Sequence, residues 1–282
     1  MQEHRKVWPL KVMCRVLAAS RSGYYAWQKR QPSVRFHRRT VLSAAIREVH
    51  QSSRATYGSP RVTAALKQGG VNCCENTVAK IMREDGLAAK VKRRFKATTD
   101  SSHDLPIAPN HLDRQFDRRR PNEAWVSDIT FIATAEGWLY LATEMDLYSR
   151  RIVGWSLSDR LTTELVAGAL AMAIRQRRPS AGLLHHSDRG CQYASSAFRE
   201  LLAAHGVACS MSRKGNAYDN APMESFYSTL KRELIHKKTY ATRDQARTEV
   251  FEYIEVFYNR QRLHSTLGYQ SPADFEAQGD SP

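Results

Sequence analysis

Three carboxylate residues stand where a purely structural sequence would rarely place an acid. Asp128 lies in the middle of the apolar run Trp-Val-Ser-Asp-Ile-Thr-Phe-Ile, and Asp188 lies in His-His-Ser-Asp-Arg-Gly at the end of a short apolar run. Glu224 follows Pro222 by two residues, at the start of an amphipathic segment. Burying an ionised carboxylate costs free energy unless the group is paired or binds a cation. These residues are therefore the first candidates for catalysis or metal binding.

Each of the three acids also has an ordinary structural explanation. A Glu in the first turn of a helix is favoured by the helix dipole, and an Asp before Arg-Gly is common in turns. Asp146 and Asp219 are two further acids of the same region, and we interpret both as turn or capping residues. Taken singly, each candidate leaves a structural role open, and a catalytic role requires that the fold bring the three together.

The charge of the chain is unevenly distributed. The chain has 282 residues and carries 43 Lys and Arg against 28 Asp and Glu, a formal net charge of +15. Residues 1–120 hold 25 basic and 9 acidic residues, whereas residues 121–282 hold 18 and 19. A basic front half and a nearly neutral back half are typical of a protein in which one domain binds nucleic acid. A generic solubilising surface is the alternative, but it gives no reason for this segregation.

Cleavage of DNA is a reaction in which such carboxylates would have a role. A phosphodiester is surrounded by negative charge, so its cleavage needs cations that neutralise the phosphate oxygens and activate the attacking hydroxyl. Mg²⁺ prefers oxygen ligands and keeps several waters, which leaves positions for a phosphate. The residues and the charge together predict a metal-dependent enzyme that acts on DNA.

Short helices with a basic end are expected in the front half. We expect two helices within 1–30, one over 41–49, one that starts at Pro60 and one over 76–82. This spacing is typical of a helix-turn-helix region, for which a plain helical bundle is the alternative. The candidate phosphate contacts are Arg61, Lys80, Arg83, Lys92, Arg93, Arg94 and Lys96.

Strands followed by helices are expected in the back half. Runs rich in β-branched and aromatic residues predict antiparallel strands over 125–133, 138–145 and 151–157. After them we expect a helix over 162–176, a strand over 182–186, a helix over 196–205, a strand over 207–211, helices over 220–235 and 242–258, and a polar tail. The predicted fold class is α/β, a mixed sheet flanked by helices. The predicted domains are a helical DNA-binding region over 1–97, a basic linker over 98–120 and a catalytic core over 121–282.

Several spaced motifs match one known family over nearly the whole chain. They are SRSGYY (20–25), YGSPR (57–61), WVSDITFI (125–132), HSDRGCQY (186–193), GNAYDNAPMESF (215–226) and YNRQRLHSTLGY (258–269). Thirty-five residues separate Asp188 from Glu224. In these motifs the chain resembles the second reading-frame product of the insertion sequence 3 family of transposases, which are similar to retroviral integrases.

The resemblance implies an RNase H-like core with a mixed five-stranded sheet, preceded by the helix-turn-helix region. It also implies that Asp128, Asp188 and Glu224 are an Asp-Asp-Glu triad that holds two Mg²⁺ ions, with Asp128 as the bridge and Mn²⁺ as a possible substitute. Lys231, two helical turns after Glu224, matches a basic position that would hold a DNA phosphate. A solvated helix lysine is the alternative for Lys231.

The implied activity is that of a DNA transposase. Such an enzyme binds the inverted-repeat ends of its element, cuts one strand and joins the 3′-hydroxyl to target DNA. Two rivals are a nuclease that hydrolyses DNA without joining it, and a DNA-binding regulator with an inactive core. The implied partners are double-stranded DNA and further copies of the chain. The upstream reading-frame product is a further expected partner or fusion, because this chain shows no sustained heptads.

The sequence argues against zinc, membrane and secretory classes. The five cysteines include no CxxC pair, and His185 and His186 lack the partners of a zinc site. The longest apolar run is about half the length that a membrane helix needs, and no secretory signal opens the chain. We expect a cytoplasmic protein of a bacterium, associated with its nucleoid DNA.

Overall fold

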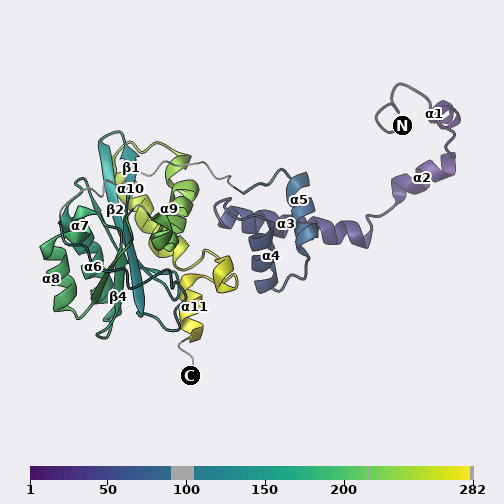
Figure 1. Cartoon of the computed structure of the whole chain (residues 1–282). Coiled ribbons are helices and arrows are strands. Elements are labelled where there is room, and N and C mark those ends of the chain that lie inside the picture. Colours follow the sequence, from purple (N-terminus) through teal and green to yellow (C-terminus); the bar gives the residue numbers. More distant parts are fainter. Residues whose placement is uncertain (90–104, 215, 280–282) are drawn as a thin grey trace. The chain divides into compact units, whose positions relative to one another are not determined.

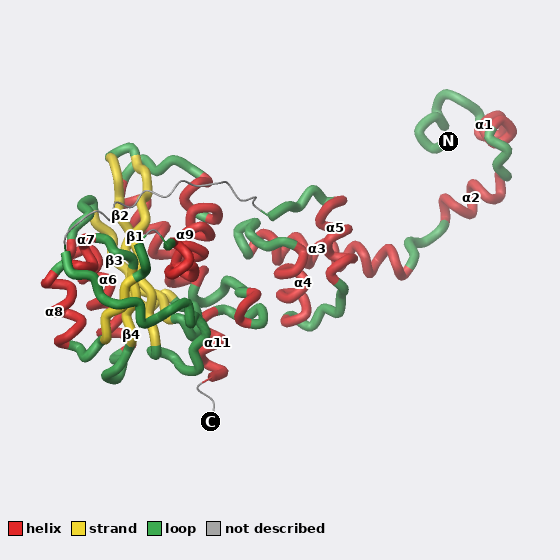
Figure 2. The backbone as a smooth tube through the Cα atoms, viewed as in Figure 1, coloured by secondary structure: helices red, strands yellow, loops and turns green. Residues whose placement is uncertain are grey.

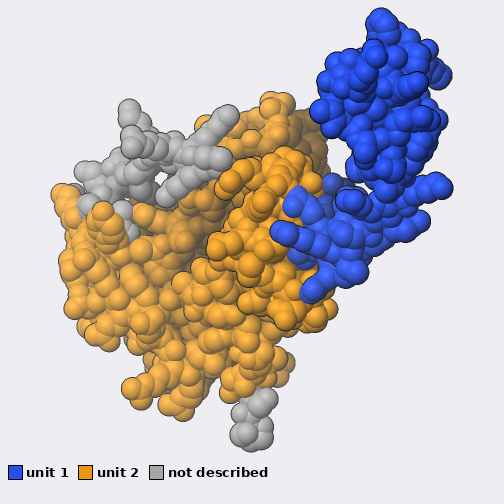
Figure 3. Space-filling view, turned by 90° about the vertical axis from the view of Figure 1, so that its right-hand side faces the viewer, with its two compact units in different colours: residues 1–49 blue, residues 50–282 orange. Residues whose placement is uncertain are grey.

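The computed structural model describes residues 1–89, 105–214 and 216–279. The predicted phosphate contacts Lys92, Arg93, Arg94 and Lys96 lie outside the described residues. By its internal contacts the chain forms two compact units, residues 1–49 and residues 50–282 (Figure 3). The functional boundaries expected at residues 97 and 120 stay predictions. Among the described helices, none combines the length and apolarity needed to cross a membrane.

The front of the chain is helical, as the sequence predicts. Ser20 caps the second helix by accepting the amide of Gly23 at 2.9 Å, and Pro60 lies in the first turn of the fourth. The third helix begins before the expected segment. Its exposed, Arg-rich first turns carry no apolar periodicity, so the sequence pattern did not indicate them. The helices are α1 (Leu10–Val16), α2 (Arg21–Lys29), α3 (Val34–Ser52), α4 (Ser59–Gln68) and α5 (Glu75–Glu84).

A five-stranded mixed sheet forms the centre of the larger unit (Figures 1 and 2). Its order is β3-β2-β1-β4-β5, with β1, β2 and β3 as antiparallel neighbours and β4 and β5 parallel to β1. The RNase H-like arrangement is therefore confirmed. The strands are β1 (Ala124–Thr134), β2 (Gly137–Asp146), β3 (Ile152–Ser158), β4 (Leu184–Ser187) and β5 (Ala208–Met211).

Helices cover both faces of the sheet because successive side chains of β1 enter two different cores. Val126 and Ile132 belong to the core under α9 and α10, whereas Trp125 belongs to the core under α6, α7 and α8. At Gly154 of β3 a Cβ would lie 2.2 Å from the main-chain oxygen of Ala169, so the close packing of α6 requires glycine there. The helices are α6 (Thr163–Arg177), α7 (Cys191–Ala194), α8 (Ser196–Ala204), α9 (Ala221–Glu233) and α10 (Arg243–Phe251).

Residues 259–279, expected to be a polar tail, instead contain helical segments and bury several side chains, among them Leu263, Leu267 and Glu276. A π-helical segment (Glu252–Tyr258) continues α10, followed by a 3₁₀ turn (Ser265–Leu267) and α11 (Pro272–Gly279). Arg262 and Glu233 are each 3% exposed and pair through two bonds of 2.9 and 2.8 Å. The sequence pattern did not indicate this burial, because the buried charges of Arg262 and Glu276 are neutralised by partners that lie far away in the chain.

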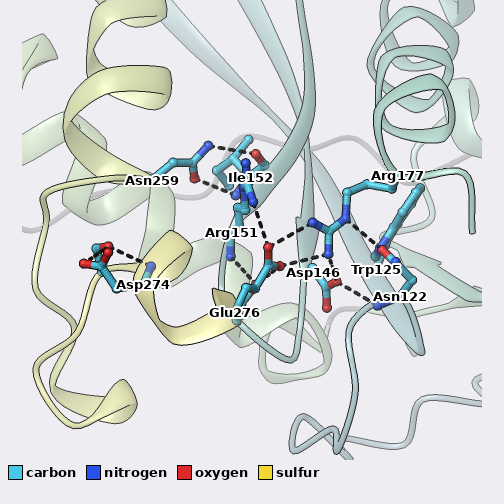
Figure 4. A network of polar contacts seen from close by, with 11 residues as sticks. Asn122, Trp125, Asp146, Arg151, Ile152, Arg177, Asn259, Asp274 and Glu276 are labelled. Atoms are coloured by element: carbon cyan, nitrogen blue, oxygen red, sulfur yellow. Dashed lines mark hydrogen bonds and ion pairs between the residues drawn. The ribbon is translucent and has the colours of Figure 1, made fainter. Parts of the chain in front are cut away.

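A polar network fixes α11 to the sheet (Figure 4). Glu276 accepts hydrogen bonds from Arg151 at 2.8 Å and from Arg177 at 2.9 Å. Arg177 also contacts the carboxylate of Asp146 at 3.3 Å, and Asp146 accepts the amide of Tyr148 at 2.9 Å. Asp146 therefore closes a turn, as its sequence position predicts, and additionally holds the C-terminal helix.

Part of the segment expected as a linker packs on the core. Leu112 is fully buried, and the hydroxyl of Ser210 in β5 accepts its amide at 3.3 Å. Asp219 accepts hydrogen bonds from Asn110 at 3.0 Å and from Arg114 at 2.8 Å. Asp219 therefore fixes this segment beside the start of α9 rather than only capping a local turn.

Candidate active site

The parallel pairing of β1 and β4 places two of the candidate carboxylates on neighbouring strand paths. The register joins Trp125 to His185 and Val126 to His186. Continued by two residues, this register sets Asp128 opposite Asp188, and adjacent strand paths lie about 4.8 Å apart. Both aspartates are partly buried. The sheet therefore brings together two acids that lie far apart in the sequence.

Main-chain amides fix one oxygen of each aspartate. Asp128 Oδ1 accepts the amide of Ile129 at 2.7 Å, and Asp188 Oδ1 accepts the amide of Gly190 at 2.9 Å. At Gly190 a Cβ would lie 3.0 Å from Asp188 Oδ1, so this tight turn favours glycine. Because these bonds restrict the side-chain rotamers, both carboxylates are positioned before any ligand binds.

Glu224 is presented by the exposed first turn of α9, and two contacts tie that helix to β1. Asn220 donates to the main-chain oxygen of Ser127 at 3.0 Å. Tyr227, one turn after Glu224, donates its hydroxyl to the main-chain oxygen of Asp128. The start of α9 is thus held against the part of β1 that carries Asp128.

The charge of Asp128 interacts with those of Asp188, Glu224 and Lys231. Burial, followed by the charges of Asp188 and Glu224, raises the pKa of Asp128 well above its usual range. Burial also raises the pKa of Glu224. Burial lowers the pKa of Lys231, and the charge of Asp128 opposes that change. We call Asp128, Asp188, Glu224 and Lys231 the acidic site.

The donor set of the acidic site suits hard divalent cations. In the described part of the chain, no group of three or more His, Cys, Asp or Glu side chains is arranged to hold a metal ion. Two ions that share Asp128 would each need only two of these carboxylates as protein ligands, with waters or phosphate oxygens as the others. A cation would also relieve the repulsion that raises the pKa of Asp128. The three acids therefore fit Mg²⁺ or Mn²⁺ by their chemistry.

The paired histidines are used inside the fold. His185 lies 3.1 Å from Glu144, and both side chains are fully buried. His186 lies 2.8 Å from the hydroxyl of Ser210 and 3.1 Å from that of Ser212. Burial, followed by the charge of His185, lowers the pKa of His186 to about 4, so its ring is neutral at pH 7. These partners give the histidines a role in holding β4 to β2 and β5.

The remaining predicted contacts lie on the helices before the sheet. Lys80 and Arg83 are exposed on α5, opposite its buried apolar side. Arg61 of α4 is partly buried and lines a cleft beside α9. Arg150, Arg232 and Arg262 line the same cleft, although the sequence patterns assigned them no role. The motif YNRQRLHSTLGY, which contains Arg262, was the only sequence feature that could have indicated one of them.

Replacing Asp128 tests the free-energy cost of burying its negative charge beside those of Asp188 and Glu224. Where folding raises the pKa of a carboxyl, the protein loses stability as the pH rises through the pKa of the folded state. We expect Asp128→Asn to raise the melting temperature at pH 8 in EDTA by roughly 2–4 °C, the effect of about 1 kcal/mol in a domain of this size. The gain should shrink at lower pH and in Mg²⁺. Asp244→Asn, which removes an acid that is 96% exposed, serves as the control. A lower melting temperature for Asp128→Asn at pH 8 would contradict this interpretation.

Comparison with known proteins identifies the family. Models of an HTH-like domain and of an integrase core domain match residues 37–95, 118–217 and 224–279. The chain is 48% identical over 263 residues to the uncharacterized 31 kDa protein of insertion element IS600 of Shigella sonnei, covering 93% of this chain and 97% of the relative. It is 41% identical over 278 residues to the transposase InsF for insertion sequence IS3A of Escherichia coli, covering 98% and 96%. The chain belongs to the IS3 family of transposases.

The transposase also has similar solved structures. One is the intasome of simian T-cell lymphotropic virus in complex with a regulatory subunit of PP2A, with 16% identity and a TM-score of 0.49 over 83% of this chain and 74% of the other. Family membership implies nucleotidyl transfer on DNA, and the helix-turn-helix-like domain implies that the transposase binds DNA.

Proposed function

We propose that this transposase binds the inverted-repeat ends of its element, cleaves one strand and joins the freed 3′-hydroxyl to target DNA. The observation that carries the proposal is that Asp128, Asp188 and Glu224 come from β1, the end of β4 and α9 of an integrase core, and that the charges of Asp188 and Glu224 act on Asp128. Double-stranded DNA is the substrate at both steps, and an oligomer of the chain would hold two element ends together.

The three acids would hold two Mg²⁺ or Mn²⁺ ions, with Asp128 shared, Asp188 on one ion and Glu224 on the other. Such ions neutralise phosphate oxygens and lower the pKa of an attacking hydroxyl. The amide bonds to Asp128 and Asp188 keep both carboxylates oriented. Lys231, within the electrostatic reach of Asp128, would hold a phosphate oxygen beside the acids. Arg61, Lys80 and Arg83 would contact phosphates farther along the DNA.

A cleavage and joining assay tests this function. Labelled duplexes that carry the element's ends are incubated with the full chain in Mg²⁺, Mn²⁺ or EDTA, and duplexes with scrambled ends serve as the control. We expect nicked and joined products that require a metal and the correct ends. Nicking without joining would favour a nuclease, and binding without cleavage would favour a regulator; either result would overturn the proposal.

Lys231→Gln tests the phosphate contact beside the acids. Hydrogen bonds to charged groups contribute about 1.5–3 kcal/mol, so we expect the cleavage rate to fall at least tenfold. Lys231→Arg should retain most of the rate, because it keeps the charge. Lys238→Gln is the control, since Lys238 is 45% exposed and pairs with Glu249. A wild-type rate for Lys231→Gln in single-turnover measurements would show that this lysine is only a solvated helix residue.

A further inference from the structure

A cleft of about 400 Å³ lies along α9, beside the acidic site. α9 contributes Ser225, Thr229 and Arg232, which follow one another at intervals of four and three residues and therefore share one side of the helix. Glu224 and Lys231 are seven residues apart and share the adjacent side. The other arginines of the cleft and a histidine come from three further segments of the chain: Arg61, Arg150, Arg262 and His264. We call this pocket the arginine cleft.

Of the four guanidinium groups of the arginine cleft, one is neutralised by a carboxylate. Arg262 pairs with Glu233, and both side chains are 3% exposed. The other three have neutral partners among the described residues. Arg61 lies over the ring of Tyr57, with 5.8 Å from its guanidinium carbon to the ring centroid. Arg150 donates to the main-chain oxygen of Phe116 at 3.3 Å, and Arg232 donates to the hydroxyl of Thr229 at 3.3 Å.

Burial disfavours the charge of two of the other arginines of the cleft. Burial, followed by the charge of Arg262, lowers the pKa of Arg61. Burial also lowers the pKa of Arg150, and the charges of Tyr258, Asp117 and Asp146 only partly oppose that change. Burial and then Arg262 and Arg61 lower the pKa of His264 well below its usual range, so the positive charge resides on the arginines. Partly buried guanidinium groups whose direct partners are neutral are a favourable environment for an anion.

We propose that the arginine cleft binds a phosphodiester of the DNA strand that passes the acidic site. The inference rests on the proposed function, because it requires that the DNA bound at the acidic site also contact the adjacent side of α9. Arg61, Arg150 and Arg232 would donate to the phosphate oxygens, and the hydroxyls of Ser225 and Thr229 line the same wall. Since Glu224 projects from the adjacent side of α9, the bound phosphate would set the path of the strand toward the carboxylates. The cleft residues are thus assigned a positioning role.

DNA binding in EDTA tests the cleft without requiring catalysis. The full chain is titrated into a fluorescent duplex that carries the element's end, over a series of salt concentrations. We expect Arg232→Gln and Arg150→Gln each to weaken binding about tenfold, the effect of losing about 1.4 kcal/mol. The slope of log K against log salt should decrease by about 1 for each lost phosphate contact. Arg175→Gln, which removes an exposed helix arginine of α6, should leave both values unchanged.

Inorganic phosphate serves as a second probe, which separates a DNA phosphate from a free anion. We expect phosphate to compete weakly with the duplex for wild type and not to affect the melting temperature of Arg232→Gln. If millimolar phosphate stabilises wild type through the cleft while Arg232→Gln and Arg150→Gln bind DNA normally, the cleft binds a free anion and the inference is wrong. Circular dichroism of each variant checks that it is folded.

The two proposals fail in different ways. If the variants lose DNA affinity but wild type neither cuts nor joins DNA, the arginine cleft stands and the proposed function fails. If wild type cuts and joins DNA while Arg232→Gln and Arg150→Gln have the affinity and salt dependence of wild type, the proposed function stands and the cleft inference fails. Absence of DNA binding by wild type would contradict both.

Discussion

Glu224→Gln is expected to lower the rate of strand cleavage and joining by the transposase by about a hundredfold to a thousandfold. The substitution keeps the size of the side chain and the first turn of α9 but removes a negative charge that acts directly on Asp128. Losing one charged group that stabilises a transition state typically costs a factor of about 10²–10³ in rate, or roughly 3–4 kcal/mol. Single-turnover rates in Mg²⁺ measure the loss.

A matched control separates catalysis from helix capping. Glu164 occupies the first turn of α6, as Glu224 does in α9, and is exposed. Glu164→Gln should therefore change stability as a capping acid would and leave the cleavage rate unaltered. The affinity of Glu224→Gln for duplex DNA in EDTA should equal or exceed that of wild type. If Glu224→Gln cleaves as fast as Glu164→Gln, Glu224 is a structural acid.

Arg262→Met is expected to lower the free energy of unfolding by about 3–5 kcal/mol. The change leaves Glu233 buried without its cation, in contact with the hydroxyl of Tyr253 at 2.8 Å. The double variant Glu233→Gln, Arg262→Met should recover a large part of the loss, because it removes both charges. Urea unfolding of the two single variants and the double variant gives the coupling free energy. Equal destabilisation by the single and double variants would show that the ion pair contributes little.

The same ion pair predicts a pH dependence of stability. Burial alone would raise the pKa of Glu233, but the bonds from Arg262 outweigh it and hold the pKa below its usual range. Stability from a carboxyl whose pKa is lowered by folding is present above the unfolded pKa and is lost as the pH falls through the folded value. The difference between wild type and Arg262→Met should thus be largest near neutral pH and shrink below about pH 4. A difference that does not change between pH 7 and pH 3 would contradict this assignment.

Local patterns predicted the elements that the sheet needs. The apolar and β-branched runs predicted β1, β2 and β3, and the apolar stripe that begins at Leu165 predicted α6. In each element the residues of the pattern form the buried side. The fold of residues 259–279 could not be predicted from local patterns, because the burial of Arg262 depends on its ion pair with Glu233 in α9. Likewise, Leu112 lies in a segment without apolar periodicity, and only its burial in the core shows its role.

The candidate site was predictable in its residues but not in its geometry. Asp128 was recognisable as an acid within an apolar strand, and the spacing of Asp188 and Glu224 matched a known motif. Their proximity depends on the parallel register of β1 and β4, which no local pattern encodes. The four arginines of the arginine cleft come from four separate segments, so the sequence offered only Arg61 as a single candidate contact.

Counting bound Mn²⁺ ions tests most directly whether the three carboxylates form a metal site. Electron paramagnetic resonance can follow free Mn²⁺ during titration of the transposase bound to an element end, with the same duplex alone as the reference. We expect two additional ions for wild type, about one for Asp188→Asn or Glu224→Gln, and none at comparable affinity for Asp128→Asn. The same number of ions for wild type and all three variants, or none for wild type, would contradict the assignment of Asp128, Asp188 and Glu224 as the metal-binding triad.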